Sequence, residues 1–107
     1  MSFQVKVRPQ VWVFATTLGL EHRRAFKRAV TGLATEKGDI RALGDNLSGY
    51  YRLKVARYRV IFRYTPGQVI ECVFAEERKL VYEIFESEMN RILQDESPRP
   101  PAGDQRS

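Results

Sequence analysis

One stretch, residues 47–64 (LSGYYRLKVARYRVIFRY), constrains the fold of this chain more than any other. Its apolar and charged residues alternate in two successive runs, which is the pattern of two half-buried β-strands. Ala56 and Arg57 separate the two runs. A two-residue turn at this point predicts a β-hairpin in which Val55 pairs with Tyr58. We therefore expect the chain to fold around an antiparallel hairpin.

The same register gathers positive charge on one face of the hairpin. Lys54 falls opposite Arg59, and the basic side chains that share this face are Arg52, Lys54, Arg59 and Arg63. Like charges that face each other across strands destabilise a sheet, so such a face requires an anionic partner or solvent. Ala-Arg is a poor sequence for the favoured primed turns, and a bulge or a longer loop is the alternative. The shared face is better determined than the turn, because a slip of one residue would bury the charges.

The chain of 107 residues suffices for a single domain with one core, which we assign to residues 1–95. Residues 96–107 (ESPRPPAGDQRS) are rich in Pro and polar residues, so we expect a disordered tail there. The net charge is +5, and residues 1–79 carry 15 Lys and Arg against 7 Asp and Glu. This basic body indicates a polyanionic partner, which can be nucleic acid, an anionic membrane or an acidic protein.

Several functional classes lack their signatures. The one cysteine, Cys72, has no second cysteine for a disulfide, and no cluster of Cys and His has the spacing of a zinc site. The chain contains no phosphate-binding glycine loop and no hydrolase elbow, so we predict no cofactor. No apolar run approaches the length of a membrane span, and the first residues alternate like a strand. We expect a cytoplasmic protein without membrane association.

The remaining segments predict a mixture of strands and helices. A short strand at residues 3–7 ends at Pro9, which places it near a sheet edge. Residues 11–17 are ambiguous, residues 21–37 are expected to form a helix closed by Gly38, and residues 38–46 form a polar connection. A strand at 69–75 with apolar residues on both parities is expected to be covered on both faces. Residues 80–95 are expected to begin as a short strand and continue as a helix.

The helix predicted at residues 21–37 is amphipathic. Its apolar side carries Phe26, Ala29, Val30 and Leu33, and its basic side carries Arg23, Arg24, Lys27 and Arg28. The basic side is either a solvated face or a surface that contacts RNA backbone or an acidic peptide. His22 is the only histidine and falls toward the apolar flank, which favours a packing role over acid–base chemistry. Trp12 and Phe14 have no cationic neighbours in the sequence, so we interpret them as core or packing residues and not as a base-stacking platform.

The basic face of the hairpin suits a phosphodiester. RNA cleavage by its own 2′-hydroxyl needs a base, cations that stabilise the phosphorane and an acid for the leaving oxygen, and it requires no metal. Guanidinium groups hold phosphate oxygens in pairs, which suits Arg52, Arg59 and Arg78. Lys54 is a candidate base because neighbouring cations favour its neutral form. Tyr82 can stack on a nucleobase or relay a proton. The alternative is that these are surface charges of a basic domain.

The same residues carry a family resemblance. The motif L-x-G-x-Y-R-x-K-V-x-x-Y-R-V-I-F at residues 47–62, followed by a strand and then by Arg78-x-x-Val81-Tyr82, resembles the core motif of the RelE/ParE superfamily of bacterial toxins. The resemblance implies an α+β fold: a small antiparallel sheet of about four strands, two N-terminal helices on one face and a C-terminal helix. It is closer to the RelE-like branch, whose members cleave mRNA in the ribosomal A site, than to ParE-like proteins, which act on DNA gyrase.

The resemblance also implies roles for individual residues. The positions that match the catalytic cluster are Arg52, Lys54, Arg59, Arg78 and Tyr82, and those that we expect to contact RNA are Arg63, Arg57, Arg23 and Lys27. The chain departs from the family pattern at two places. Arg52 replaces a lysine, and the acidic pair Glu76-Glu77 precedes the motif arginine. The general base is therefore open between Lys54, Tyr82 and Glu77.

The partners that the resemblance implies are a cognate antitoxin protein and mRNA on the ribosome, with contacts to ribosomal RNA. A flexible segment of the antitoxin would mask the basic site. Two other functions stay open at this point. One is a non-catalytic inhibitor that binds DNA gyrase, and the other is an inactive toxin fold that serves as a binding module.

Overall fold

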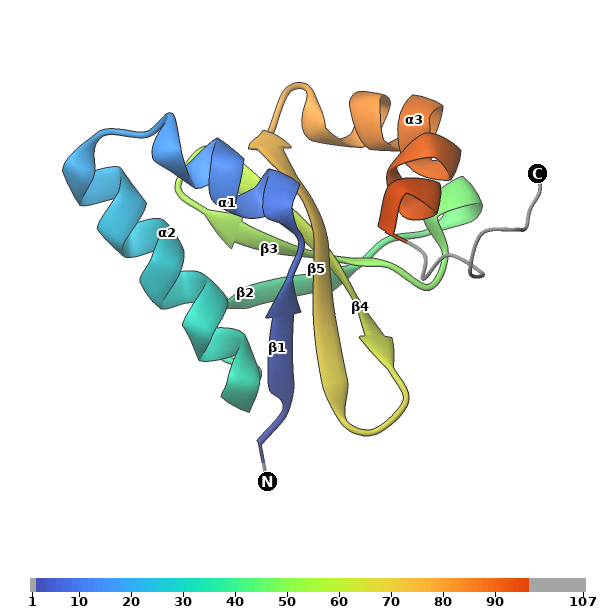
Figure 1. Cartoon of the computed structure of the whole chain (residues 1–107), viewed down its shortest axis with the longest axis horizontal. Coiled ribbons are helices and arrows are strands. Elements are labelled where there is room, and N and C mark those ends of the chain that lie inside the picture. Colours follow the sequence, from blue (N-terminus) through green and yellow to red (C-terminus); the bar gives the residue numbers. More distant parts are fainter. Residues whose placement is uncertain (1, 97–107) are drawn as a thin grey trace.

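The computed structural model describes residues 2–96 of the chain (Figure 1). The strands in this part are β1 (Gln4–Val7), β2 (Asp39–Ala42), β3 (Tyr51–Val55), β4 (Tyr58–Thr65) and β5 (Val69–Glu77). The helices are α1 (Pro9–Thr16), α2 (Leu20–Gly32) and α3 (Val81–Glu96), with short 3₁₀ turns at Leu33–Thr35 and Asp45–Leu47. The tail expected at residues 97–107 lies outside the described residues, and Glu96 belongs to α3.

The strands form one sheet in the order β1-β5-β4-β3-β2. The three pairs from β2 to β5 are antiparallel, whereas β1 runs parallel to β5. The α+β class is therefore as predicted, but the sheet is mixed and has five strands instead of about four antiparallel ones. The additional strand is β2, which replaces part of the polar connection expected at residues 38–46. Ile40 is its one partly buried residue, so β2 shows no apolar alternation in the sequence.

The β3–β4 hairpin has the predicted register. Val55 pairs with Tyr58 and Lys54 with Arg59, and the ladder between β3 and β4 has no shift. Ala56 makes the tight turn possible by adopting a φ of 54°, in the left-handed region. A residue other than Gly, Asn or Asp in that region is uncommon, which is why a bulge or a longer loop was the alternative prediction. The predicted basic face is thus confirmed as a feature of the backbone.

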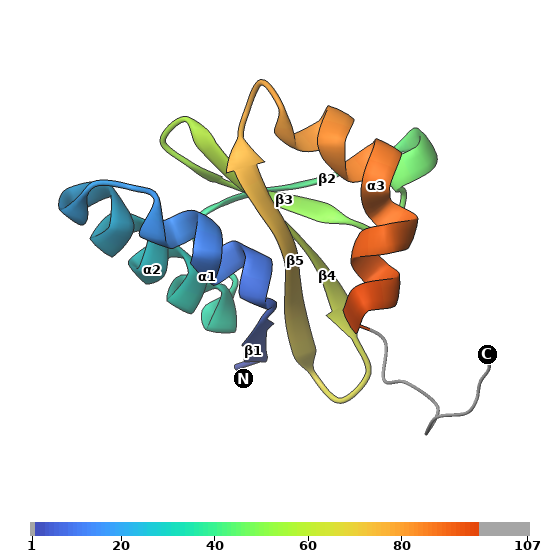
Figure 2. The ribbon, with the colours of Figure 1, turned by 45° about the horizontal axis from the view of Figure 1, so that its top comes forward.

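Helices cover both faces of the sheet, so the protein has two apolar clusters (Figures 1 and 2). The first cluster lies under α1 and α2 and includes Val11, Phe26, Leu53, Val60 and Phe62. The second lies under α3 and includes Leu47, Ile61, Val73, Phe74 and Phe85. A bulge in β5 supplies this second cluster, because the pairing shifts between Ile61 and Phe62 and leaves Val73 and Phe74 together on the α3 side. The two faces of β5 are both covered, as predicted.

Two helix boundaries differ from the sequence-based expectation. α2 ends at Gly32, and Glu36 then takes a φ of 55°, so the helix does not continue to residue 37. The N–H of Lys37 donates to the carbonyl of Gly32 at 3.0 Å, which closes the end of the helix. α3 begins at Val81 without the expected short strand. Val81 and Phe85 lie one helical turn apart and are both fully buried against the sheet.

The aromatic residues near the N-terminus have different environments. Phe14 is partly buried and its ring lies 5.6 Å from that of Tyr58, which confirms the predicted packing role. Trp12 instead keeps 37% of its surface exposed, and the Nζ of Lys27 lies 6.0 Å from the centre of its ring. The expectation that Trp12 lacks a cationic neighbour is therefore wrong. Lys27 comes from α2, and a contact between two helices cannot be seen in the local sequence.

A side chain extends the sheet at the end of β1. The last pair between β1 and β5 is Val7 with Cys72, and α1 begins two residues later. The amide of Gln10 then donates to the carbonyl of Ala75 at 2.8 Å and accepts from its N–H at 2.9 Å. These are the two hydrogen bonds that a strand residue would make. Cys72 itself is fully buried, and burial raises the pKa of its thiol to about 12.

An ion-pair cluster joins the connection after β1 to β4, β5 and α3. The carboxylate of Glu71 accepts from Arg8 Nε at 2.9 Å and from Arg63 Nε at 2.9 Å. Arg8 is 6% exposed and also donates to the carbonyl of Ile92 in α3 at 3.2 Å. Burial alone would raise the pKa of Glu71, but the hydrogen bonds from Arg63 and Arg8 outweigh it and hold the pKa below its ordinary value. The cluster therefore fastens the last turns of α3 to the sheet.

Replacement of Glu71 by Gln is expected to lower the free energy of unfolding by about 2–3 kcal/mol at pH 7, because Arg8 and Arg63 both lose the carboxylate that they contact. A lowered folded-state pKa contributes stability above the ordinary value of 4.5, and this contribution is lost as the pH falls through the folded-state value. The difference between the wild type and Glu71→Gln should thus shrink in acid. Urea unfolding at pH 7 and at successively lower pH values measures it.

Glu88→Gln is the control, because Glu88 forms an exposed ion pair with Arg91 one turn away on α3. Its effect should stay below about 0.5 kcal/mol. An equal loss of stability in both variants would contradict the structural role of Glu71.

Candidate functional site

The register of the sheet places a row of charged residues on the α3 face. The positions that share this face are Asp39 and Arg41 on β2, Arg52 and Lys54 on β3, Arg59 on β4 and Glu76 on β5. Arg41 is opposite Arg52, and Lys54 is opposite both Arg59 and Asp39. Three of the predicted catalytic residues, Arg52, Lys54 and Arg59, are thus brought together on neighbouring strands.

Arg59 is the most buried of these cations, with only 8% of its surface exposed. Its Nη1 donates to the carbonyl of Ala56 at 3.0 Å and to the carbonyl of Tyr58 at 2.9 Å. Within residues 2–96 it forms no ion pair with a carboxylate, although it faces Glu76 in the register. A buried cation held only by carbonyls is costly. Such a group becomes favourable when an anion binds beside it.

Arg52 is held by the neighbouring edge strand. Its Nη1 donates to the backbone carbonyl of Asp39 at 3.0 Å and to Oδ1 of the same residue at 3.2 Å. The side chain of Arg52 is 11% exposed, whereas that of Asp39 is 54% exposed. The arginine at this position, where the resembled motif has a lysine, is therefore a cation with a fixed position.

Arg41 was not predicted as a site residue. It is exposed and lies across from Arg52, so two like charges face each other on β2 and β3. The signal that would have identified it is the pairing of β2, which has no apolar alternation. Lys54 is exposed next to this pair. We call the part of the α3 face that carries Arg41, Arg52, Lys54 and Arg59 the open part of the face, and its charged side chains are mainly cations.

The structure separates Arg63 from the other cations of the hairpin. Ile61 lies between Arg59 and Arg63 on the same face of β4 and is fully buried under α3. On the side of Ile61 away from Arg59, Arg63 forms an ion pair with Glu71. The four basic residues do share one face, as predicted, but α3 divides that face into two parts. Arg63 contributes to the ion-pair cluster instead of the open part.

The turn after β5 lies beside the turn between β3 and β4. The N–H of Arg78 donates to the carbonyl of Arg57 at 2.9 Å, and a depression of about 220 Å³ between the turns is lined by Arg57, Glu77, Arg78 and Lys79. The guanidinium of Arg57 lies 5.6 Å from the centre of the Tyr58 ring, and its Nε donates to the Tyr58 hydroxyl at 3.4 Å. That hydrogen bond raises the pKa of Arg57. Arg57 and Arg78 are thus adjacent, at one end of the basic face.

Tyr82 and the acidic pair flank this region. Tyr82 is partly buried and packs against the apolar cluster under α3 that contains Ile61 and Phe74. Glu76 accepts a hydrogen bond from the N–H of Glu77 at 3.0 Å through its own carboxylate. Of the three candidates for the general base, Lys54 lies on the open part of the face, Glu77 lines the depression near Arg78, and Tyr82 stands at the start of α3.

The two remaining residues expected to contact RNA lie on the other side of the sheet. Arg23 and Lys27 belong to α2, which packs on the face opposite α3 (Figures 1 and 2). Arg23 donates to the carbonyls of Thr16 and Leu18 at 3.3 and 3.2 Å, where α1 ends. These residues cannot share one phosphate site with Arg59, and Arg23 has a structural role at the connection between the helices.

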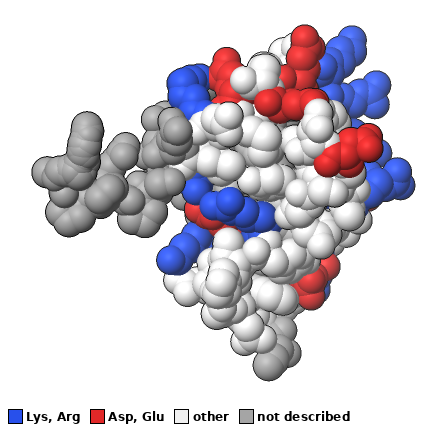
Figure 3. Space-filling model, turned by 90° about the vertical axis from the view of Figure 1, so that its right-hand side faces the viewer, with Lys and Arg blue, Asp and Glu red and all other residues white. Residues whose placement is uncertain are grey.

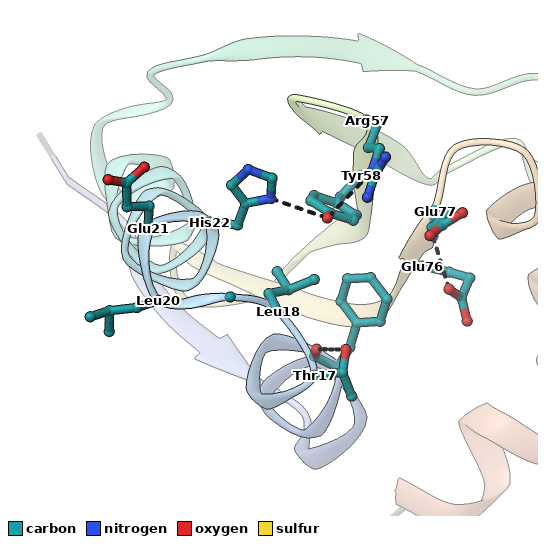
Figure 4. Close-up of a pocket in the computed structure, with 11 residues that line it drawn as sticks. Thr17, Leu18, Leu20, Glu21, His22, Arg57, Tyr58, Glu76 and Glu77 are labelled. Carbon is teal, nitrogen blue, oxygen red and sulfur yellow. Dashed lines mark hydrogen bonds between the residues drawn. The ribbon is translucent and has the colours of Figure 1, made fainter.

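A second hollow, of about 720 Å³, lies between the α1–α2 connection and the end of the hairpin (Figure 4). His22 points into it with Nδ1 3.3 Å from the hydroxyl of Tyr58, and its ring packs edge-on against Tyr58. The packing role predicted for His22 agrees with this contact. The hollow is also lined by Glu21, Glu76 and Glu77, so its charge differs from that of the basic face.

Figure 3 views the side of the molecule on which α3 lies. Most of the charged side chains stand at the rim of this view, and one compact group of basic and acidic side chains lies near its centre. Residues 2–96 contain no group of three or more His, Cys, Asp or Glu that could hold a metal ion. Their helices are also too short or too polar to cross a membrane.

A search of solved structures finds proteins with the same fold. The toxin–antitoxin complex RelBE2 of Mycobacterium tuberculosis matches with a TM-score of 0.65 and 16% identity, covering 73% of this chain and 100% of that one. The RelE–RelB complex of Pyrococcus horikoshii matches with a TM-score of 0.60 and 28% identity, covering 73% and 97%. A variant of the Escherichia coli toxin RelE in its free state gives a TM-score of 0.60 and 16% identity, covering 86% and 99%.

A scan against protein-family models and a search of curated proteins give no match. The fold likeness and the motif at residues 47–62 agree, because both are similar to those of RelE/ParE-type toxins. The resemblance seen in the sequence is thereby confirmed.

The cross-strand pair of Arg41 and Arg52 leads to a prediction about stability. Arg41→Gln removes one of two facing like charges, so the free energy of unfolding should rise by about 0.3–0.5 kcal/mol in low salt. The gain should shrink at high salt, where exposed charges are screened. Urea unfolding at two salt concentrations measures both effects. Arg41→Lys, which keeps the charge, is the control and should match the wild type. A less stable Arg41→Gln protein would argue against repulsion at this pair.

Proposed function

We propose that this protein is the toxin of a toxin–antitoxin system and that it cleaves mRNA on the ribosome. The observation that carries the proposal is the group formed by Arg52, Lys54 and Arg59 on the open part of the α3 face. Arg59 is buried without a carboxylate partner in the described residues, and Lys54 faces it directly. Such a group is suited to the charge of a phosphodiester and of its phosphorane.

The reaction begins with attack by the 2′-hydroxyl of the RNA on the adjacent phosphorus. A base takes the hydroxyl proton, the phosphorane carries extra negative charge, and an acid protonates the 5′-oxygen that leaves. Arg59 and Arg52 hold non-bridging oxygens, since each is already fixed through one edge of its guanidinium. Lys54 is the proposed base because it is exposed between them. Arg78 and Tyr82 are proposed to contribute from the turn and the helix that follow β5.

The described chain offers little besides cations to recognise a codon. The basic face is small, and its phosphate-binding residues come from β3 and β4 alone. A ribosome that presents a single-stranded codon in a fixed conformation would provide the orientation that the toxin lacks. This supports a ribosome-dependent reaction, with contacts from Arg57 and neighbouring cations to ribosomal RNA. The toxin–antitoxin complexes among the similar structures support an antitoxin partner. In this proposal the antitoxin inhibits the reaction by covering the basic face.

The decisive test is cleavage of mRNA on purified ribosomes that are programmed with a short message. Arg59→Ala and Lys54→Ala should each lower the rate at least about 100-fold, because each removes a preorganised charge at the phosphate. Arg59→Lys keeps the charge but loses the paired donors, so it should be impaired with an intact fold. Arg24→Ala on the opposite side of the sheet is the control and should cleave like the wild type. Full activity of Arg59→Ala and Lys54→Ala would refute the proposal.

The order in which translation and DNA are affected in cells distinguishes mRNA cleavage from the alternative, gyrase inhibition. Incorporation of labelled methionine should fall immediately after induction if the protein acts on mRNA. A gyrase inhibitor would first cause DNA damage, while translation continues. An inactive binding module would leave growth unaffected even in the absence of an antitoxin.

A further inference from the structure

Asp39 is the one acidic residue that contacts the proposed phosphate-binding cations in the described structure. Its carboxylate accepts from Arg52 Nη1 at 3.2 Å, and its backbone carbonyl accepts from the same atom at 3.0 Å. An acid at a phosphate site is expected to repel the ligand. Its presence therefore requires a reason beyond general charge balance.

The register supplies that reason. Asp39 lies opposite Lys54, whereas the residue opposite Arg52 is Arg41. The contact between Arg52 and Asp39 is therefore diagonal, and it draws the guanidinium away from Arg41 and toward the end of the hairpin. Lys54 and Arg59 form a pair at that end. Asp39 thus holds Arg52 on the β2 side of β3, level along the strand with Lys54 and Arg59.

Electrostatics would otherwise drive Arg52 the other way. Three cations repel one another, and the side chain of an arginine is long enough to turn into solvent. Because both contacts with Asp39 use Nη1, the opposite edge of the guanidinium, with Nε and Nη2, makes none of the hydrogen bonds described for Arg52. That edge has the paired donors that a phosphate requires. Asp39 therefore fixes one edge of Arg52 and leaves the other for the substrate.

We propose that Asp39 is a positioning residue that holds Arg52 in the phosphate-binding arrangement with Lys54 and Arg59. This inference rests on the proposed function, since it assigns a role in the same reaction. Asp39 does not touch the substrate, and its effect is transmitted through Arg52. The backbone carbonyl of Asp39 survives any substitution, so a change of the side chain tests the carboxylate alone.

The test is a double-mutant cycle on kcat/KM for mRNA cleavage on programmed ribosomes. Asp39→Ala is expected to lower kcat/KM roughly tenfold, which corresponds to the loss of one charge-assisted hydrogen bond. Asp39→Asn keeps an oxygen that can accept from Nη1, so it should recover most of this loss. Combined with Arg52→Ala, Asp39→Ala should cause no additional loss, because the residue through which it acts is gone.

Two further measurements keep the outcomes separate. Urea unfolding of Asp39→Asn and Asp39→Ala shows whether the fold is intact, and Glu83→Gln on the exposed side of α3 serves as the acidic control with unchanged activity. Additive losses in the cycle, or an Asp39→Ala protein as active as the wild type, would overturn the role of Asp39. Arg59→Ala in the same assay tests the proposed function itself. If Arg59→Ala still cleaves mRNA, the proposed function is wrong. If Arg59→Ala is inactive but the losses from Asp39→Ala and Arg52→Ala are additive, only the positioning role of Asp39 is wrong.

Discussion

The tight turn between β3 and β4 determines most of what this protein presents on its α3 face. With Ala56 in the left-handed region, the hairpin closes with two residues and Lys54 must face Arg59. The alternate residues of both strands then face the other side of the sheet, where they pack in the larger apolar cluster under α1 and α2. A one-residue slip would exchange the two faces, so the burial of Leu53, Val60 and Phe62 maintains the juxtaposition of the cations. Stability of the core and repulsion at the surface are therefore coupled through one register.

The fold could be predicted from the sequence where one residue pattern dominated a segment. The hairpin and the amphipathic α2 have strong periodicity, and the strand predicted at residues 69–75 has apolar residues on both parities. The motif pointed to two N-terminal helices. β2 and the start of α3 could not be predicted in the same way. β2 is a short edge strand with one partly buried residue, so pairing with β3 defines it instead of its own composition. The segment at Leu80 to Phe85 fits a strand or a helix, and packing against the sheet decides between them.

The candidate site shows the same division. Alternation was sufficient to place Arg52, Lys54 and Arg59 on one face, since parity follows directly from the chain. It could not distinguish Arg63, because the separation depends on α3 burying Ile61 and on Glu71 neutralising the arginine. It also could not reveal Arg41 or Asp39, which reach the face only through the pairing of β2. The contacts that distinguish a structural arginine from a functional one come from residues far apart in the sequence.

The amide of Gln10 has a consequence for how this sheet meets other molecules. A strand edge with free N–H and C=O groups attracts other strands, and proteins protect such edges to avoid association. Past the end of β1, the edge of β5 would offer such groups at Ala75, but the side chain of Gln10 already occupies both. The first turn of α1 is thereby anchored to the sheet, and β5 is closed to strand addition at this point. The protein can thus leave its cations uncovered for a partner without also leaving this stretch of backbone open to self-association.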